Sequence, residues 1–216
     1  MAFKKNYTYF ENREQRAAFI AKTFATELAQ SKRILDVGCD YNTLKKIVGD
    51  KVLGVDLYGA PDIKIDFEKE QLRQFRDQEF DFVVCTEVLE HLDNLHAMTA
   101  ELLRVSKRYV LVSLPNSHSI FTKWNILFHG HAGKFYGLPL DQPEDRHRWF
   151  FSYNDVDRFF RATCDREPFR MNRKFLHINF GRTWRGELLK NLVRVFQIDN
   201  ACQSYWILLE RTQHEA

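Results

Sequence analysis

The feature that most constrains the fold is a regular alternation of short apolar runs with segments of helical periodicity. Residues 80–85 (FDFVVC) and 109–114 (YVLVSL) are almost continuously apolar, as expected of strands buried on both faces of a parallel sheet. Between these runs, Leu95, Met98 and Leu102 fall on one helical face. A strand, a helix and a second strand in this order indicate a parallel βαβ crossover, so the chain is predicted to form an α/β sheet with helices on both faces.

The same alternation runs through the N-terminal part of the chain. Residues 1–30 are expected to contain a helix, over residues 10–30, because Ile20, Phe24 and Leu28 share one helical face. The further strands and helices expected here are strands at residues 33–37 (RILDV), 51–57 (KVLGVDL) and 62–66 (DIKID), and helices at residues 44–48 and 68–76 (EKEQLRQFR).

The pattern changes after Pro115. Residues 115–150 are irregular, aromatic and rich in histidine, and a connection of this length is usually functional. Ser152 and Asp155 have the spacing of a capping box, which predicts the start of a helix. The elements expected after it are a strand at residues 176–180, a helix at 188–196 and a strand at 205–210 (YWILLE), which could lie within the sheet or at its edge.

Composition and charge favour one cytoplasmic domain over residues 1–216. A formal net charge of +3 is too small to demand a polyanionic partner. The basic stretch from Asp165 to Arg194 could meet an anionic substrate or form a solvated face. The four cysteines form no C-x-x-C pair, which fits a reducing compartment. No apolar run approaches the roughly 18 residues of a membrane span, so no membrane partner is expected.

The turn after the first strand, residues 36–42 (DVGCDYN), has the form of a cofactor loop. Gly38 would let backbone N–H groups approach a ligand beyond the carboxyl ends of the strands. Asp40 and Asn42 stand where more glycines would be expected, and these residue types tolerate left-handed backbone conformations best. A dinucleotide site would need G-x-G-x-x-G, which is absent. Asp40 better suits a cofactor with a cationic amino or sulfonium group and no phosphate.

Acids also stand at the ends of the following strands. Asp56 ends the second strand, where a carboxylate can accept hydrogen bonds from both hydroxyls of a ribose. Asp66 and Phe67 end the third, as an acceptor and an aromatic suited to an adenine amino group and ring. The fourth strand is followed by residues 85–92 (CTEVLEHL).

These segments resemble the ordered motifs of class I S-adenosylmethionine-dependent methyltransferases. The segments that carry the resemblance are ILDVGC (34–39), VLGVDL (52–57), FDFVVCTEVLEHL (80–92) and YVLVSLPNS (109–117). The resemblance covers roughly residues 31–117. It implies a doubly wound, mostly parallel, seven-stranded Rossmann-like sheet with a reversed last strand, and residues 115–150 as a lid over the acceptor site.

The resemblance also implies S-adenosylmethionine as the cofactor. Asp36 and Gly38 would frame its methionine part, Asp56 would hold the ribose, and the adenine would lie at Asp66. The full set of implied cofactor-binding residues is Asp36, Gly38, Asp40, Asp56, Leu57, Asp66, Phe67, Thr86 and Glu87.

Histidines are the candidates for a general base that removes a proton from an acceptor hydroxyl. His91 follows the fourth strand at the rim of the cofactor site. His118, His129, His131 and His147 lie in the segment expected to roof the pocket. His147 is the preferred base, because it ends the insertion next to the expected mouth.

A metal site is the alternative role for this region. If residues 86–91 (TEVLEH) begin a helix, Glu87, Glu90 and His91 share one face and could bind a cation such as Mg²⁺. This pattern resembles the metal site of small-RNA 2′-O-methyltransferases and ubiquinone-biosynthesis O-methyltransferases. His147 stands in a place comparable to a further histidine of the RNA branch. A glutamate and a histidine after this strand also occur in class I enzymes that use no metal.

The predicted function is methyl transfer from S-adenosylmethionine to a small molecule or metabolite conjugate, with an oxygen acceptor favoured. One alternative is a metal-assisted RNA 2′-O-methyltransferase, so RNA is a further possible partner. Another is a non-catalytic partner protein that keeps the fold. The sequence indicates neither the acceptor nor the oligomeric state.

Overall fold

The computed structural model describes residues 4–7, 10, 12–132, 138, 140–141, 146–181, 183–196 and 198–212. The strands among them are β1 (Lys4–Asn6), β2 (Ile34–Val37), β3 (Val52–Asp56), β4 (Ile63–Lys64), β5 (Phe80–Thr86), β6 (Ser106–Pro115), β7 (Phe169–His177) and β8 (Ser204–Arg211). The helices are α1 (Arg13–Thr23), α2 (Ala25–Gln30), α3 (Thr43–Val48), α4 (Leu95–Val105), α5 (Ile120–His129), α6 (Tyr153–Arg166) and α7 (Trp184–Phe196), with 3-10 turns η1 (Leu89–His91) and η2 (Asp199–Ala201).

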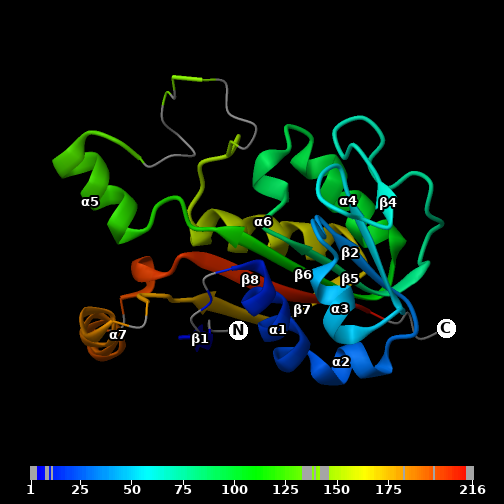
Figure 1. Cartoon of the computed structure of the whole chain (residues 1–216), viewed down its shortest axis with the longest axis horizontal. Coiled ribbons are helices and arrows are strands. Elements are labelled where there is room, and N and C mark those ends of the chain that lie inside the picture. Colours follow the sequence, from blue (N-terminus) through cyan, green and yellow to red (C-terminus); the bar gives the residue numbers. More distant parts are fainter. Residues whose placement is uncertain are drawn as a thin grey trace.

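In the described part of the chain, all eight strands join one sheet in the order β1-β7-β8-β6-β5-β2-β3-β4 (Figure 1). Strand β8 runs antiparallel to β6 and β7, whereas the other neighbouring pairs are parallel. This confirms the predicted doubly wound, mostly parallel sheet with a reversed last strand, and places that strand inside the sheet. The additional edge strand β1, which pairs with β7, makes eight strands instead of the seven expected.

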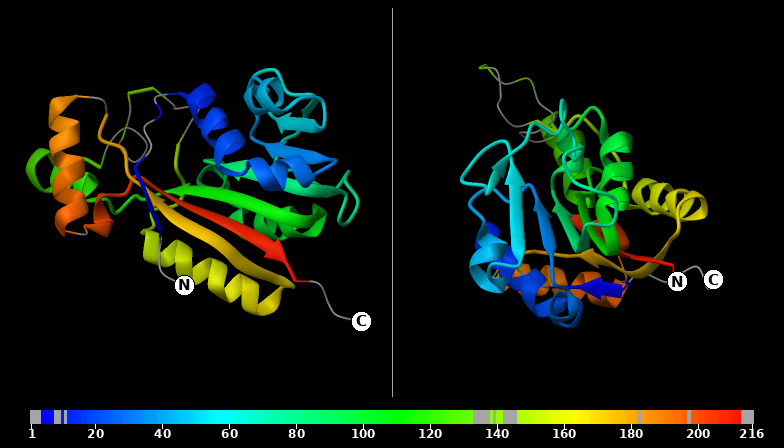
Figure 2. Two further views of the ribbon diagram at one scale, coloured as in Figure 1. Left: turned by 90° about the horizontal axis from the view of Figure 1, so that it is seen from below. Right: turned by 90° about the vertical axis from the view of Figure 1, so that its right-hand side faces the viewer.

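Two apolar layers hold the sheet between its helices. Alternate side chains of β5 point to opposite faces, as the period of a strand requires. Val83 packs with Met98 of α4 on one face, and Phe82 packs with Phe24, next to α1 and α2, on the other. Helices α4 and α6 therefore cover one face, and α1, α2 and α3 the other (Figures 1 and 2).

The prediction of a helix at residues 68–76 is wrong, since this segment forms turns. Gln71 adopts a left-handed conformation with φ of 55°, which interrupts any helix. The guanidinium group of Arg104 donates to the carbonyl oxygens of Leu72 at 3.0 Å and Phe75 at 2.9 Å. Backbone acceptors that a helix would have satisfied are thus paired by a side chain from α4.

Other elements also differ from the expectation. The helix expected over residues 10–30 divides into α1 and α2 at the fully buried Phe24. Strand β7 begins at Phe169, earlier than residue 176. Helix α5 lies in the segment expected to be irregular, and residues 133–137, 139 and 142–145 of that segment are outside the described residues. The capping box of Ser152 and Asp155 is confirmed.

Burial of His177 at the end of β7 predicts a pH-dependent stability. Its ring stacks on Phe10 at 4.3 Å, and neither ring nitrogen has a hydrogen-bond partner among the described residues. Burial lowers the pKa of His177 from 6.5 to about 4. The unfolded chain therefore binds the proton more readily, and stability that is complete above pH 6.5 is lost as the pH falls toward 4.

The free energy of unfolding, measured by urea denaturation, is expected to fall by about 2 kcal/mol between pH 7 and pH 5 through this residue. The variant His177→Leu should lose that part of the pH dependence. The control His129→Leu removes an exposed histidine and should leave the pH dependence as it is in the parent protein. Identical profiles for the parent and His177→Leu would contradict the assignment.

Candidate active site

A cavity of about 840 Å³ lies beyond the carboxyl ends of β2, β3 and β5, the place where open parallel sheets bind ligands. Its lining residues are Arg13, Arg16, Gly38, Asp40, Asp56, Leu57, Tyr58, Asp66, Phe67, Glu68, Thr86, Glu87, Val88, His91, Leu92, Arg146, His147 and Arg148. All the expected cofactor-binding residues are among them except Asp36, which is buried at the end of β2.

The turn after β2 is held by left-handed backbone conformations. Gly38 has φ of 78°, and Asp40 and Asn42 have φ of 52° and 55°, which confirms that these two residues take conformations usually left to glycine. A Cβ atom at Gly38 would lie 2.2 Å from Cγ2 of Val88. The absence of a side chain at Gly38 thus lets the turn approach the segment after β5.

Asn42 fixes the turn to β3. Its side-chain amide donates to the carbonyl oxygen of Ala60 at 2.9 Å. Its Oδ1 atom occupies the space over Gly54, where an added Cβ would lie only 1.7 Å away. The glycine in the middle of β3 and the asparagine in the turn therefore fit together, although they are far apart in the sequence.

The carboxylate of Asp56 connects the two turns at the mouth of the cavity. Oδ2 accepts a hydrogen bond from the N–H of Asp40 at 2.8 Å, and Oδ1 accepts one from the N–H of Tyr58 at 3.2 Å. A carboxylate has about four acceptor positions, so both oxygens can accept further hydrogen bonds from a ligand in the cavity.

Two buried carboxyl groups, Asp36 and Glu87, have pKa values above their usual range. Burial raises the pKa of Asp36 to about 7, and the charge of Arg16 opposes this shift. Burial also raises the pKa of Glu87. The charge of Arg16, a hydrogen bond from Ser113 and the charge of the nearby His91 oppose this shift. A cationic ligand beside these groups would favour their ionised forms.

The acceptor expected for an adenine amino group is ionised, but its neighbouring ring is largely covered. A hydrogen bond from Lys69, 2.9 Å away, holds the pKa of Asp66 below its usual value. Phe67 is only 6% exposed and belongs to the core. Its carbonyl oxygen accepts from the side-chain amide of Asn94 at 2.9 Å, which fixes the segment that lines this end of the cavity.

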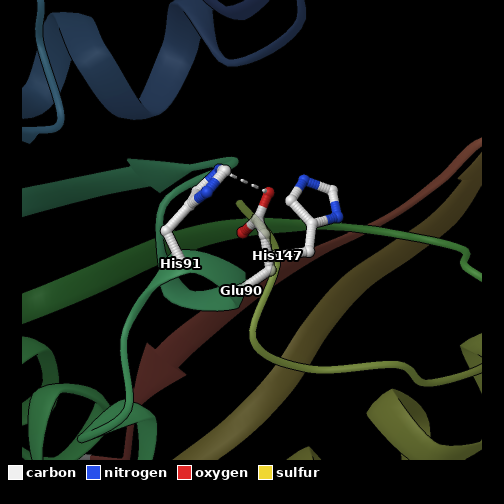
Figure 3. Close-up of side chains that lie close together, drawn as sticks. All are labelled: Glu90, His91 and His147. Carbon is white, nitrogen blue, oxygen red and sulfur yellow. Dashed lines mark ion pairs between the residues drawn. The ribbon is translucent and has the colours of Figure 1, made fainter. Parts of the chain in front are cut away.

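Glu90, His91 and His147 form a cluster (Figure 3), and its two histidines line the cavity. One ligand atom from each lies within 4.8 Å of the others. Glu90 is fully buried, and its Oε1 is 3.7 Å from Nε2 of His91. The rings of His91 and His147 are 4.8 Å apart and nearly perpendicular. The two candidate bases are therefore brought together with a buried carboxylate.

Glu87 does not belong to this cluster. It has φ of 57°, and the helix begins only at Leu89, as the 3-10 turn η1, so the expected i, i+3, i+4 face from Glu87 does not form. The Oε1 atom of Glu87 instead accepts a hydrogen bond from the hydroxyl of Ser113 at 2.8 Å. Of the four residues considered for a metal, Glu90, His91 and His147 therefore lie together and Glu87 lies apart from them, and a bound metal stays a prediction.

Residues 146–149, here called the strap, place His147 beside η1. The N–H of Arg148 donates to the carbonyl oxygen of Glu90 at 2.8 Å, and its Nε donates to that of His91 at 2.8 Å. The indole N–H of Trp149 donates to the carbonyl oxygen of Leu92 at 2.6 Å. These bonds join segments more than 50 residues apart and hold the backbone that carries His147 beside η1.

Comparison with known proteins identifies the family. A family model described as a methyltransferase domain matches residues 9–163. The chain belongs to this family. The predicted family of class I methyltransferases, with S-adenosylmethionine as its cofactor, is thereby confirmed.

Named relatives of this methyltransferase are distant. A ubiquinone biosynthesis O-methyltransferase of Hahella chejuensis is 31% identical over 93 residues, which is 35% of this chain and 39% of the relative. The chain thus matches only about two fifths of that relative's length.

Two solved structures share the fold of this methyltransferase. One is an S-adenosylmethionine-dependent methyltransferase from Archaeoglobus fulgidus, with a TM-score of 0.63 at 18% identity, covering 93% of this chain and 95% of that one. The other is magnesium protoporphyrin IX methyltransferase from Synechocystis with bound S-adenosylhomocysteine, with a TM-score of 0.57 at 14% identity, covering 95% of this chain and 90% of that one.

The methyltransferase site contains two cationic residues that sequence reasoning missed. Arg13 and Arg16 of α1 line the cavity, and Arg13 forms an ion pair with Asp40. Their spacing places both on one side of the helix, but no local signal shows that α1 turns that side toward the turn after β2. In contrast, His118, His129 and His131 are not among the residues that line the cavity, and the lid expected over residues 115–150 stays a prediction.

Proposed function

We propose that this methyltransferase transfers the methyl group of S-adenosylmethionine to a hydroxyl oxygen of a small molecule. The observation that carries this proposal is the cluster of Glu90, His91 and His147 at the rim of the cofactor cavity. A hydroxyl acceptor must lose a proton during transfer, and imidazole is the usual group that takes it. The name of the Hahella chejuensis relative, an O-methyltransferase, supports the choice of oxygen.

In this proposal the cofactor's cationic end lies near Asp36 and Glu87, and its ribose hydroxyls donate to Asp56. The acceptor oxygen attacks the methyl carbon in line with the sulfur atom, so that a C–O bond forms while the C–S bond breaks. The sulfur leaves with the electron pair of that bond as neutral S-adenosylhomocysteine. The acceptor's proton passes to a ring nitrogen of His147, which follows from the place of this histidine in the lining of the cavity.

Within the same cluster, Glu90 and His91 support the base. The buried carboxylate of Glu90 lies 3.7 Å from the ring of His91, and its negative charge stabilises an imidazolium formed next to it. This arrangement resembles the general case of a base that a third group orients. Glu90 therefore acts through the histidines and does not contact the acceptor.

The donor set of Glu90, His91 and His147 also fits a divalent cation. Two imidazoles and one carboxylate suit a transition metal better than Mg²⁺, which prefers oxygen ligands. Such an ion, when bound, would lower the pKa of an acceptor hydroxyl. The three side chains would then hold the ion instead of receiving the proton.

The test is formation of S-adenosylhomocysteine from S-adenosylmethionine with a panel of acceptors: phenols, catechols, aliphatic alcohols, amines and single-stranded RNA. The enzyme is first treated with chelator and then assayed with and without Mn²⁺, Zn²⁺ or Mg²⁺. Turnover with hydroxyl acceptors is the expected result. Persistence of that turnover after chelation would assign His147 as the base, and its loss with recovery on adding metal would assign the cluster as a metal site.

Other outcomes of this assay contradict the proposal. Turnover with amines only would overturn the oxygen acceptor. Turnover with RNA only, dependent on metal and steeply on salt, would support the RNA alternative. Failure to bind S-adenosylhomocysteine would support a non-catalytic partner protein.

A further inference from the structure

Helix α5 exposes an apolar face. Ile120, Phe121, Trp124, Leu127 and Phe128 recur at the spacing of one helical stripe, and all five are exposed, Leu127 by 75% and Trp124 by 58%. The helix has no buried residue. In an ordinary surface helix this stripe would pack against the core, so its exposure calls for a partner outside the chain.

Helix α7 also exposes apolar side chains. Its inner side, with Gly186 and Val193, is buried against the protein. Its outer side carries Trp184, Leu188, Leu192 and Val195, of which Trp184 is 73% and Val195 74% exposed. Two helices separated by more than 50 residues therefore both present tryptophan and aliphatic side chains to solvent.

The two helices lie at one end of the molecule, on the left in Figure 1. Phe121 of α5 contacts Phe180, which precedes α7, with ring centres 5.6 Å apart. Helix α5 follows the carboxyl end of β6, and α7 follows the carboxyl end of β7. Both helices thus stand at the edge of the sheet that also carries the cofactor cavity.

The charges of α5 and α7 favour an anionic partner over a second copy of the chain. The two helices contain Lys123, Arg185, Lys190 and Arg194 against a single acid, Glu187. Two copies of the chain meeting through this end would bring like charges together, which opposes association. An anionic bilayer is complementary, because its surface attracts Lys and Arg while its interface accommodates tryptophan and aliphatic side chains.

We propose that the end formed by α5 and α7 is a docking surface for anionic lipid bilayers. The helices lie in the interface, with Trp124, Leu127, Leu188 and Val195 inserted among the lipids. No described helix is long and apolar enough to cross a membrane, and surface docking requires none. The expectation of no membrane partner rests on the absence of a spanning segment and does not apply to docking on a bilayer surface.

Docking would also bring the edge of the sheet that carries the cavity toward the bilayer. If the proposed function holds, an amphiphilic hydroxyl acceptor could then reach the enzyme from the lipid phase. This consequence depends on the proposed function, whereas the docking surface does not.

The test is flotation of the purified full-length chain with vesicles of phosphatidylcholine containing about 30% phosphatidylglycerol, compared with phosphatidylcholine alone. Binding to the anionic vesicles that weakens with salt is expected. Tryptophan emission should shift to the blue on binding, because Trp124 and Trp184 are exposed whereas Trp206 is fully buried. This measurement needs no cofactor or acceptor, so its failure is distinct from failure of the methyl-transfer assay.

Variants of α5 and α7 test whether each helix contributes to vesicle binding. Trp124→Ser/Leu127→Ser in α5 and Leu188→Ser/Val195→Ser in α7 should each weaken vesicle binding by at least about tenfold. The matched control Ile47→Ser removes an apolar side chain that is 48% exposed on α3 and should bind as the parent does. All these side chains are at the surface, and circular dichroism verifies that the variants fold.

Three results would overturn the proposal. The first is no flotation with anionic vesicles. The second is equal flotation with both vesicle types, since it would remove the charge argument. The third is a dimer of the chain, by light scattering, that both double variants dissociate, which would assign the surface to a second copy.

Discussion

Replacing Asp56 by alanine is expected to weaken the binding of S-adenosylhomocysteine by at least about a hundredfold. The variant loses the two hydrogen bonds that its carboxylate accepts from Asp40 and Tyr58, so both turns at the mouth of the cavity loosen. It also loses the oxygens proposed to accept the ribose hydroxyls. A hydrogen bond to a charged group contributes about 1.5–3 kcal/mol, and calorimetric titration of the purified protein measures the Kd.

The variant Asp62→Ala is the matched control. Like Asp56, Asp62 accepts a backbone hydrogen bond, from Gly54 at 2.8 Å. Asp62 also forms an ion pair with Lys45, and it does not line the cavity. It should lower the free energy of unfolding and change the Kd by no more than about threefold. Equal weakening in both variants would mean that Asp56 acts only through the fold, and an unchanged Kd in Asp56→Ala would remove its assigned role.

Replacing His147 by alanine should lower kcat by about a hundredfold to ten-thousandfold, the range that a general base contributes. Glu90→Gln keeps the shape of the buried side chain and removes its charge. Because that charge is proposed to stabilise the imidazolium, kcat should fall in this variant too. In both variants S-adenosylhomocysteine should bind as in the parent, because neither residue is assigned to the cofactor. The measurement pairs kcat on the best hydroxyl acceptor with calorimetric titration.

The control for this prediction is His118→Ala. His118 lies in the same insertion and contacts Phe150, with ring centres 4.7 Å apart, but it does not line the cavity. Its kcat should stay near that of the parent enzyme. A parent-like kcat in His147→Ala would exclude both the base and the metal-ligand role, and a loss of cofactor binding in that variant would show that the strap supports the cofactor site.

The central strands and the acids at their ends could be predicted because the information is local. A buried parallel strand such as β5 has a continuous apolar sequence, and Asp56 is the last residue of its own strand. The tolerance of Asp40 and Asn42 for left-handed conformations is a property of the residue types alone. These features need no knowledge of distant contacts, and all of them appear in the structure.

The features that escaped prediction depend on contacts between distant segments. Residues 68–76 have a helical composition, but Arg104 from α4 pairs their carbonyl oxygens in turns. Glu87 leaves the expected helical face because Ser113 of the neighbouring strand binds it. Arg13 reaches the cavity only because α1 lies beside the turn after β2, and hydrophobic periodicity does not give that placement.

The position of β8 has a consequence for how the protein is made. Of the strands that the structure describes, β8 comes last in the chain, yet it separates β6 from β7 in the sheet. During synthesis on the ribosome, one edge of β6 has no partner strand until β8 emerges. Strand β6 contains the apolar residues Val110, Leu111 and Val112. An unfilled sheet edge of this kind recruits other strands. The nascent chain therefore passes through an aggregation-prone interval that ends only when β8 is inserted, and chaperones would have to protect it until then.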